Sequence, residues 1–390
     1  MNAYLDNSAT TKPCEKAIKK ALEMMNENFG NPSSLHACGF SAKKESDNAR
    51  KTVAFFLGCQ ENEIFFTPSG TIANNTAIFG TEKARRRDGK KVITTLFEHP
   101  SVLKCFENLE EQGYDVVYLK PDSNGRINLD VLSNAVDENT ILVSVMAVNN
   151  EVGSVQDISK IKGIIKENKS KAYFHCDAVQ AFGKISIKPK KLGIDLMSMS
   201  AHKIHGVKGA GALFINNGVR ILPYVLGGGQ ESGMISGTEA LPAICAFGEA
   251  VNDIGNVEKN YEKVKSVRDY FVNEISSLEK VYINSPEDAL PYIINISVEG
   301  VPSQVMLNSL SSMGIYVSAG SACAKGHRSN VLTAMGILPQ SIDSAIRISL
   351  SKFTTEDEMK MLYNGIKDTI KRVRRWIWKK LYLLRTANLP

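Results

Sequence analysis

Residues 196–203 read Leu-Met-Ser-Met-Ser-Ala-His-Lys, a largely apolar run that ends in a serine, a histidine and a lysine. Such a run is typical of a strand buried in an α/β sheet. The carboxyl ends of these strands border the crevice in which α/β proteins bind ligands. Lys203 is therefore a candidate for a lysine that forms a Schiff base, with Ser200 and His202 available to an anionic group. For the lysine taken alone, simple surface exposure is the commoner explanation.

Strand and helix patterns alternate on both sides of this stretch as far as residue 250. Strands are expected at 64–67, 92–96, 116–119, 141–148, 172–176, 196–200 and 212–215, and helices at 15–28, 42–57, 71–87, 101–112 and 158–168. This alternation predicts an α/β fold with a mainly parallel sheet covered on both faces. A helix over 251–278 and strands at 293–298, 315–318 and 345–350 predict a smaller α+β domain. The expected division is a large domain, 13–250, and a small domain made of 1–12 and 251–390.

Composition and charge exclude several classes of protein. The chain is 43% hydrophobic and 23% charged, which is typical of a globular protein, and it contains no apolar run of membrane-spanning length. The N-terminus has neither a basic start nor a hydrophobic stretch, so no secretory signal is expected and a cytoplasmic location is predicted. The seven cysteines have no C-x-x-C spacing, so neither a disulfide framework nor a metal site is predicted. The net charge of +6 comes from residues 367–385, which hold eight basic residues and one acid, so the remainder gives no reason to expect nucleic acid.

Three further motifs follow predicted strands or turns. Asp177 is a candidate partner for a protonated ring nitrogen, although Asp at such a position is also a common helix N-cap. Gly70 and Thr71 open a predicted helix, where free N–H groups and the helix dipole favour a phosphate; an ordinary capped turn is the alternative. His99 follows a strand, where packing or capping is the commoner role of a lone histidine. None of these motifs decides the function alone.

Taken in order, ten motifs occur together along the chain. They are Tyr4-Leu-Asp-Asn-Ser-Ala-Thr-Thr11, Asn31-Pro-Ser-Ser-Leu-His36, Phe66-Thr-Pro-Ser-Gly-Thr-Ile-Ala-Asn-Asn75, Glu98-His99, Asn149-Asn-Glu-Val-Gly153, Asp177-Ala-Val-Gln180, Ser200-Ala-His-Lys-Ile-His-Gly206, Gly227-Gly-Gly-Gln-Glu231, Ser318-Ala-Gly-Ser-Ala-Cys323 and Arg347-Ile-Ser-Leu350. Together they resemble the NifS/IscS-like cysteine desulfurases of the class V aminotransferase group, over about residues 4–355. The resemblance implies the PLP-dependent transferase fold type I, with pyridoxal 5′-phosphate (PLP) as cofactor and a homodimer as the assembly.

The resemblance also implies roles for individual residues. Lys203 corresponds to the lysine that binds PLP covalently, Asp177 to the acid on its ring nitrogen, and His99 to the imidazole stacked on the ring. Arg347 corresponds to the arginine that binds the substrate carboxylate. Cys323 corresponds to the nucleophile that takes the sulfur of L-cysteine as a persulfide, leaving L-alanine, and passes it to an acceptor protein for iron–sulfur cluster assembly or tRNA thiolation. The other implied contacts are Gly70, Thr71, Gln180, Ser200 and His202 on the cofactor, Asn150 on cofactor and substrate, and Thr238 from across a dimer interface.

Three positions differ from the family pattern. Ile72 stands where the family has an acid, and Ser232 and Ile235 stand where it has two arginines. One hypothesis is that apolar packing replaces an ion-pair cluster, a change that can be neutral or stabilising. Two functions stay open beside the desulfurase. One is a class V enzyme that acts on selenocysteine or another amino acid. The other, which these differences motivate, is a catalytically weak scaffold or regulatory homologue.

The segment 357–385 is predicted to form an amphipathic helix with a basic face. Five apolar residues recur at helical spacing and form one stripe: Leu362, Ile366, Ile370, Val373 and Ile377. The segment also holds both tryptophans of the chain, Trp376 and Trp378. Packing on the small domain with a solvated basic face is the simpler interpretation. A docking surface for an acidic acceptor protein or an anionic membrane surface is the alternative.

Overall fold

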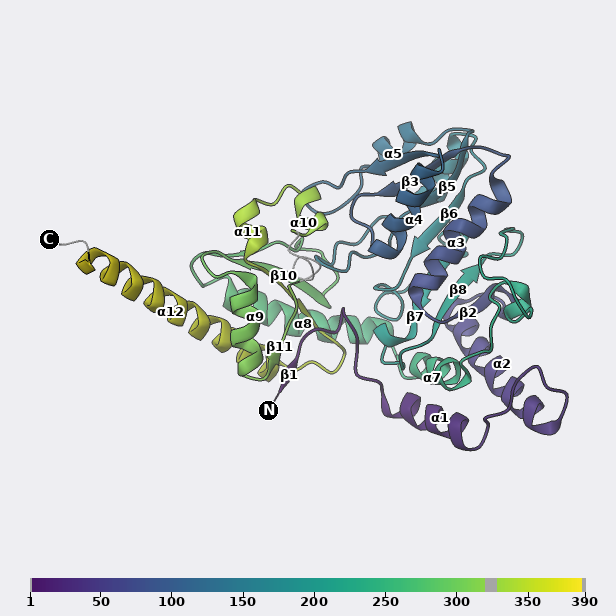
Figure 1. The fold of residues 1–390 in the computed structure, drawn as a ribbon, viewed down its shortest axis with the longest axis horizontal. Helices are drawn as coiled ribbons and strands as arrows, with labels where there is room; N and C mark the ends of the chain where they lie inside the picture. The colour runs from purple at the N-terminus through teal and green to yellow at the C-terminus, as the bar shows by residue number, and fades with distance from the viewer. Residues whose placement is uncertain (1, 320–327, 388–390) are drawn as a thin grey trace. The chain divides into compact units, whose positions relative to one another are not determined.

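The computed structural model describes residues 2–319 and 328–387, and from residue 374 onward it describes the backbone alone. The chain divides into two compact units (Figure 1). The large unit contains residues 10–150 and 154–260, and the small unit contains the described parts of 1–9 and 261–390 together with Glu151–Gly153. The sequence places the boundaries after residues 12 and 250 and gives no sign that Glu151–Gly153 belongs to the small unit.

A seven-stranded sheet forms the centre of the large unit. Its strands are β2 (Ile64–Thr67), β3 (Lys91–Thr95), β4 (Asp115–Leu119), β5 (Thr140–Ser144), β6 (Tyr173–Asp177), β7 (Leu196–Ser200) and β8 (Gly211–Ile215), in the order β2-β8-β7-β6-β5-β3-β4. Every neighbouring pair is parallel except the two that β8 forms, with β2 and with β7. The predicted α/β class with a mainly parallel sheet is confirmed.

Helices cover both faces of this sheet because successive side chains of a strand point to opposite faces. Phe65 of β2 packs with α3 (Gly70–Arg85) on the face where α4 (Pro100–Glu111) also packs. Phe66, the next residue, meets Phe247 of α7 (Leu241–Asn252) at a ring-centroid distance of 6.3 Å. The other helices of the unit are α1 (Glu15–Asn26), α2 (Ala37–Leu57), α5 (Leu129–Ala135) and α6 (Ile161–Glu167), and short 3-10 turns occur at Glu61–Glu63, Ala201–Lys203 and Glu231–Gly233.

The small unit combines short strands with helices. Strand β10 (Ile293–Val298) pairs antiparallel with β9 (Val281–Ile283) and β12 (Ala345–Ser349), and β1 (Ala3–Tyr4) pairs parallel with β11 (Ile315–Tyr316). Its helices are α9 (Ser303–Ser312), α10 (Asn330–Ala334), α11 (Pro339–Asp343) and α12 (Glu356–Ala387). In the described part of the chain, no helix has the length and apolar character of a membrane span.

The prediction of one helix over 251–278 is wrong. Helix α7 ends at Asn252, and α8 (Val257–Ile275), which continues into the small unit, begins four residues after the α7 C-cap Asp253. Gly255 lies between them with φ +71°, a left-handed conformation that ends a helix and that glycine adopts without strain.

Candidate active site

The candidate residues of the large unit lie where strands end. Strands β2, β3, β6 and β7 run in one direction, so their carboxyl ends share one edge of the sheet. Asp177 ends β6, Ser200 ends β7 just before Lys203, and His99 follows β3. Strand β2 leads to the N-terminus of α3 at Gly70. This is the edge at which α/β sheets bind ligands.

The Asp177 carboxylate is buried and held by two N–H donors. The Val179 backbone donates to Oδ1 at 2.9 Å, and Asn74 Nδ2 donates to Oδ2 at 2.8 Å. Only 5% of the residue is exposed, and within the described residues no cation lies at ion-pair distance from it. A buried carboxylate in this state is chemically suited to a protonated ring nitrogen.

A chain of hydrogen bonds links Asp177 to His99. Asn74 Nδ2 also contacts Ser101 Oγ at 2.8 Å, and Ser101 Oγ lies 2.8 Å from His99 Nδ1. The Ser101 backbone N–H donates to the same ring nitrogen at 3.1 Å, so His99 is the N-cap of α4. The structure therefore brings two predicted residues, Asp177 and His99, into one network and shows that His99 also caps a helix.

Glu98 is a buried acid beside this network. Its Oε1 accepts from the Met146 backbone N–H at 2.6 Å and from Thr95 Oγ1 at 3.2 Å, while Oε2 has no partner among the described residues. Burial, and then the negative charge of Asp177, raise the pKa of Glu98 well above its ordinary value. The shift favours the protonated form of Glu98, which adds no negative charge beside Asp177.

The N-terminus of α3 and the end of β7 form a tight, polar corner. Ser200 Oγ is buried and has no hydrogen-bond partner in the described part of the chain. A Cβ at Gly70 would lie 2.9 Å from Val179 Cγ2, and one at Gly211 would lie 2.7 Å from the Ser69 carbonyl carbon. An unpartnered hydroxyl beside a helix N-terminus fits a phosphate. Thr71, the next predicted contact, is exposed.

Lys203 and His202 follow on the 3-10 turn after β7, and both are half-buried. His202 Nδ1 lies 3.2 Å from Thr10 Oγ1. Burial, followed by the charges of Lys203, Lys208 and Lys184, lowers the pKa of His202 to about 4. A neutral imidazole still has one N–H group with which it can donate a hydrogen bond.

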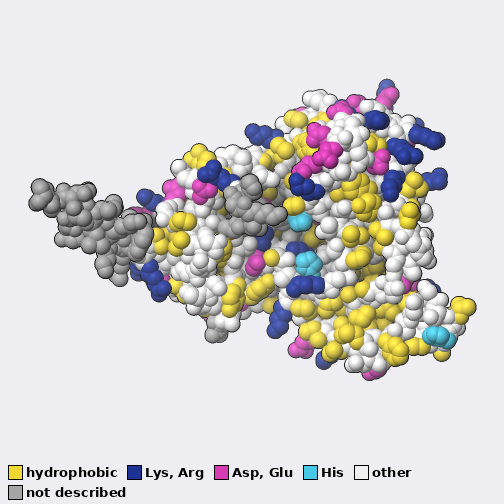
Figure 2. Space-filling model, viewed as in Figure 1, with side chains coloured by type: hydrophobic (Ala, Val, Ile, Leu, Met, Phe, Trp, Pro, Cys, Tyr) yellow, Lys and Arg dark blue, Asp and Glu magenta, His cyan; other side chains and the backbone are white. Residues whose placement is uncertain are grey.

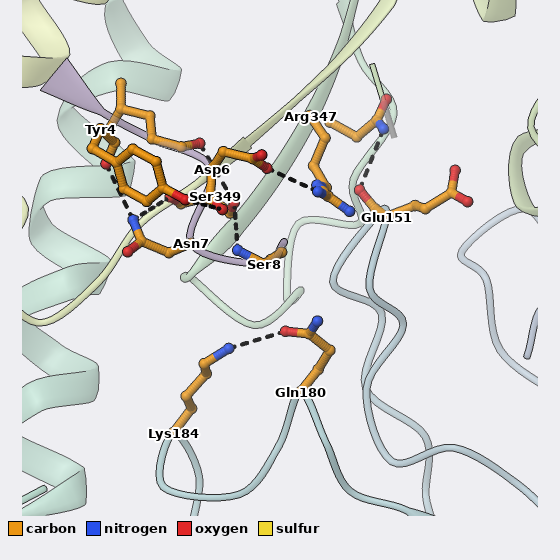
Figure 3. A network of polar contacts seen from close by, with 11 residues as sticks. Tyr4, Asp6, Asn7, Ser8, Glu151, Gln180, Lys184, Arg347 and Ser349 are labelled. Atoms are coloured by element: carbon orange, nitrogen blue, oxygen red, sulfur yellow. Dashed lines mark hydrogen bonds and ion pairs between the residues drawn. The ribbon is translucent and has the colours of Figure 1, made fainter. Parts of the chain in front are cut away.

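Two polar candidates lie on turns of the large unit. Lys184 Nζ donates to Gln180 Oε1 at 3.0 Å (Figure 3). Asn150 is half-buried and follows Asn149, whose Nδ2 donates to the Phe97 carbonyl at 3.0 Å.

The remaining candidates lie elsewhere in the chain. In the small unit, Arg347 of β12 pairs with Asp6, with 2.9 Å between Nη2 and Oδ1 (Figure 3). The Arg347 side chain is 7% exposed. In the large unit, Thr238 is exposed. Cys323 lies outside the described residues.

The sequence profile described as aminotransferase class-V matches residues 3–362. The chain belongs to this family. Cysteine desulfurase IscS of Methanosarcina thermophila is 40% identical over 375 residues, which cover 95% of this chain and 92% of that protein. Putative cysteine desulfurase IscS 1 of Bacillus subtilis is 40% identical over 95% of this chain and 99% of its own.

Solved structures agree with this family assignment. A NifS-like protein matches with a TM-score of 0.91 at 35% identity, covering 95% of this chain and all of that one. A structure described as SspA in complex with cysteine matches with a TM-score of 0.80 at 31% identity, covering 90% of this chain and all of that one. The predicted family and the predicted fold type I are confirmed.

The three departures from the class-V pattern have different surroundings. Ile235 is 6% exposed and its backbone bridges to Val225, which fits the hypothesis of apolar packing. Ser232 is exposed in a left-handed conformation, with φ +55°, so it takes no part in such packing. Ile72 is half-buried. Next to Ser232 in the sequence, the buried Glu231 pairs with the half-buried Arg50, at 2.7 Å.

Four described thiols of this class-V chain are poorly suited to nucleophilic attack, because the thiolate is the reactive form. Burial raises the pKa of Cys59, Cys105 and Cys245 to about 12, and that of Cys176 well above its ordinary value. The described cysteines form no disulfide, and no group of three potential metal ligands occurs within the described residues.

The sequence does not single out Asn74, Ser101 or Arg50. For Asn74 a weak signal exists, because two consecutive asparagines inside a helix are unfavourable for helix propensity and call for another explanation. Ser101 resembles any polar residue in a first helical turn, and Arg50 any charge on a helix.

Proposed function

We propose that this chain is a PLP-dependent cysteine desulfurase, which converts L-cysteine to L-alanine and passes the sulfur to an acceptor. The carboxyl edge of the sheet carries the proposal. There the buried Asp177 carboxylate and the unpartnered Ser200 hydroxyl lie on adjacent strands, and Lys203 follows. The family and the relatives named cysteine desulfurase support the same activity.

The residues of this edge fit PLP at three points. The Lys203 amine is suited to its aldehyde, the Asp177 carboxylate to its ring nitrogen, and Ser200 with the N-terminus of α3 to its phosphate. When bound, PLP supplies an electron sink next to the substrate α-carbon. The further contacts that we assign to it are Gly70, Thr71, His99, Asn150, Gln180, His202 and, from a second copy of the chain, Thr238.

The chain's own groups then handle the substrate. The Arg347 guanidinium binds its carboxylate, with Asn150 as a second contact, and the Lys203 amine moves its α-proton. The Cys323 thiolate attacks the substrate sulfur. An S–S bond forms while the C–S bond breaks, and return of a proton to carbon yields alanine.

An exposed apolar stripe on α1 supports a homodimer. Ile18, Leu22 and Met25 recur at helical spacing and are 41%, 49% and 54% exposed, and Leu35 beyond the helix is 88% exposed. Figure 2 shows apolar side chains gathered over the region of α1, α7 and α2. Contiguous apolar patches of this kind mark protein contacts. The identity of the acceptor, whether an iron–sulfur scaffold or a tRNA-thiolation enzyme, and the cytoplasmic location stay predictions.

Alanine and sulfide released from L-cysteine by the PLP-loaded chain test the activity. Lys203→Ala should release neither, and Cys323→Ser should still bind PLP but form no persulfide. Mass spectrometry of the wild-type chain after reaction should locate the extra sulfur on Cys323. Sulfur on Cys176 or Cys245 would contradict that assignment. A wild-type chain that binds PLP yet forms no alanine would favour the scaffold function, and turnover of selenocysteine alone would favour the selenocysteine enzyme.

A further inference from the structure

We propose that Asn74 and Ser101 are positioning residues that hold His99 as a neutral imidazole with its proton on Nε2 and fix the orientation of the Asp177 carboxylate. The catalytic meaning of this inference rests on the proposed function. The hydrogen-bond arrangement itself is a property of the chain and is tested without cofactor.

The donors and acceptors in this row of hydrogen bonds are fixed at the Asp177 end. A carboxylate only accepts hydrogen bonds, so the Asn74 atom that lies 2.8 Å from Asp177 Oδ2 is the amide nitrogen. The same nitrogen lies 2.8 Å from Ser101 Oγ. An amide nitrogen has two hydrogens, so Asn74 donates one to each partner.

The His99 end is set by two donors of Ser101, its backbone N–H and its hydroxyl. The Ser101 N–H donates to His99 Nδ1 at 3.1 Å, so that nitrogen carries a lone pair and no proton. Ser101 Oγ, 2.8 Å from the same nitrogen, therefore donates its hydroxyl hydrogen to it. The proton of the neutral ring is then on Nε2, because the hydrogen bonds at one ring nitrogen set the state of the other.

Burial of Asn74 shows that this arrangement is not a by-product of packing. The residue is 1% exposed, and its Oδ1 has no partner among the described residues. A buried acceptor without a partner is unfavourable, and an apolar side chain would fill this helix position at lower cost. The advantage of asparagine at this position is therefore the pair of hydrogen bonds that its Nδ2 donates to Asp177 and Ser101.

The arrangement serves both ends of the proposed site. Asp177 receives one fixed N–H on each oxygen, from Val179 and Asn74, so neither oxygen rotates away from a ring nitrogen. His99 keeps a neutral ring with a donor on Nε2, and a neutral ring adds no positive charge beside a cationic cofactor ring.

Histidine tautomers give a readout that a purely structural role would not change. The full chain, labelled with ¹⁵N-histidine and freed of PLP, is studied by two-bond ¹H–¹⁵N correlation, with His99→Gln identifying the signal. We expect His99 in the Nε2–H form in the wild type and again in Ser101→Thr. In Ser101→Ala only the backbone donor remains at Nδ1, so we expect a measurable share of the Nδ1–H tautomer beside the Nε2–H form. A wild-type ring with its proton on Nδ1, or an unchanged ring in Ser101→Ala, would overturn the proposal.

Binding of PLP tests the link between the two ends. Asn74→Ala and Ser101→Ala should each weaken PLP binding roughly tenfold. The double variant should bind PLP only slightly more weakly than Asn74→Ala, because the single change already interrupts the hydrogen-bond network. Asn75→Ala is the matched control, since among the described residues Asn75 Nδ2 donates to two backbone carbonyls, those of Thr71 and Ser101, at 2.9 and 3.2 Å, and not to Asp177 or a side chain of the network. Fully additive losses, or equal binding by Asn74→Ala and Asn75→Ala, would refute the link.

The tautomer measurement and the PLP-binding measurement test the two proposals independently. A wild-type chain that does not bind PLP refutes the proposed function and leaves the tautomer result to decide the arrangement. Thermal unfolding of each variant is recorded first. Ser101→Ala removes a single hydroxyl, so its tautomer result decides the proposal if Asn74→Ala does not fold.

Discussion

At the scale of single residues, Glu98 links the stability of the large unit to pH. Burial and the charge of Asp177 raise the pKa of Glu98 well above its ordinary value. The folded chain thus keeps a proton that the unfolded chain loses above pH about 4.3. Retention of this proton contributes to the free energy of unfolding. The contribution is fully present below pH about 4.3 and is lost, by up to about 1.4 kcal/mol per pH unit, as the pH rises toward the folded-state pKa of Glu98. Glu98→Gln, which stays neutral, should resist urea better than the wild type at pH 8, and its advantage should shrink toward pH 5.

The matched control is Glu107→Gln on α4, whose side chain is 47% exposed. Its urea midpoint should follow that of the wild type at every pH. An advantage of Glu98→Gln that does not vary with pH would mean that Glu98 is ionised in the folded chain.

The site residues that sequence reasoning finds are those that local patterns mark. Asp177, Ser200 and Lys203 follow apolar runs, and the carboxyl end of a buried strand is a recognisable place. Asn74 and Ser101 are different, because their importance lies in a contact between two helices that no local pattern encodes. His99 has two roles, helix cap and network member, and only the first is visible in the sequence.

At the scale of elements, an ion pair between the half-buried Arg50 and the buried Glu231 joins α2, β2 and the turn after the glycine run 227–229. Arg50 donates to both oxygens of Glu231, at 2.7 and 2.8 Å, and the Phe66 backbone N–H donates to Oε2 at 2.8 Å. Glu231 holds a left-handed φ of +49°, which an L-residue adopts only when its surroundings enforce it. Arg50→Met leaves the carboxylate buried without its cation and should cost about 3–5 kcal/mol of stability, measured from urea midpoints.

Lys43→Met on the same helix is the control, because Lys43 and Asp47 form an exposed pair at 3.3 Å. That change should cost about 1 kcal/mol or less. The double variant Arg50→Met, Glu231→Gln should recover part of the loss. Equal costs for Arg50→Met and Lys43→Met would show that the pair of Arg50 and Glu231 does not hold the turn.

Elements were predictable where a long pattern repeats. Strands 64–67 and 196–200 occur with the predicted bounds, since their apolar runs end at polar residues. The short elements α5, α10, α11 and β9 have too few residues for a period to show. The break between α7 and α8 depends on one backbone angle at Gly255, which helical periodicity alone does not reveal.

At the scale of the whole molecule, the proposed dimer predicts a coupling between assembly and cofactor binding. Leu22→Asp places a charge in the apolar stripe of α1 and should shift the chain from dimer to monomer in sedimentation. Because Thr238 is proposed to reach the PLP of the second copy, the monomer should also bind PLP roughly tenfold more weakly. Leu338→Asp, at a leucine of the small unit that is 60% exposed, is the control and should stay dimeric. A Leu22→Asp dimer would place the interface elsewhere.

Removal of the end of α12 tests whether this helix serves delivery of sulfur and not catalysis. The family profile ends at residue 362, whereas the helix continues to Ala387 and residues 367–385 hold eight basic side chains. Truncation after Lys371 keeps the buried Met359, Leu362, Ile366 and Ile370 and the 2.7 Å contact of Thr369 with Ser309, so the small unit should fold. Alanine formation should then be unchanged, while transfer to an acidic acceptor falls roughly tenfold at low salt, a difference that salt screens away. The control is Lys265→Gln, which removes one positive charge from α8 and should leave sulfur transfer unchanged. Equal sulfur transfer by the truncated and full-length chains would mean that the basic face is only solvated. If the truncation instead abolished binding to anionic vesicles and left sulfur transfer unchanged, the basic face would be a membrane-binding surface.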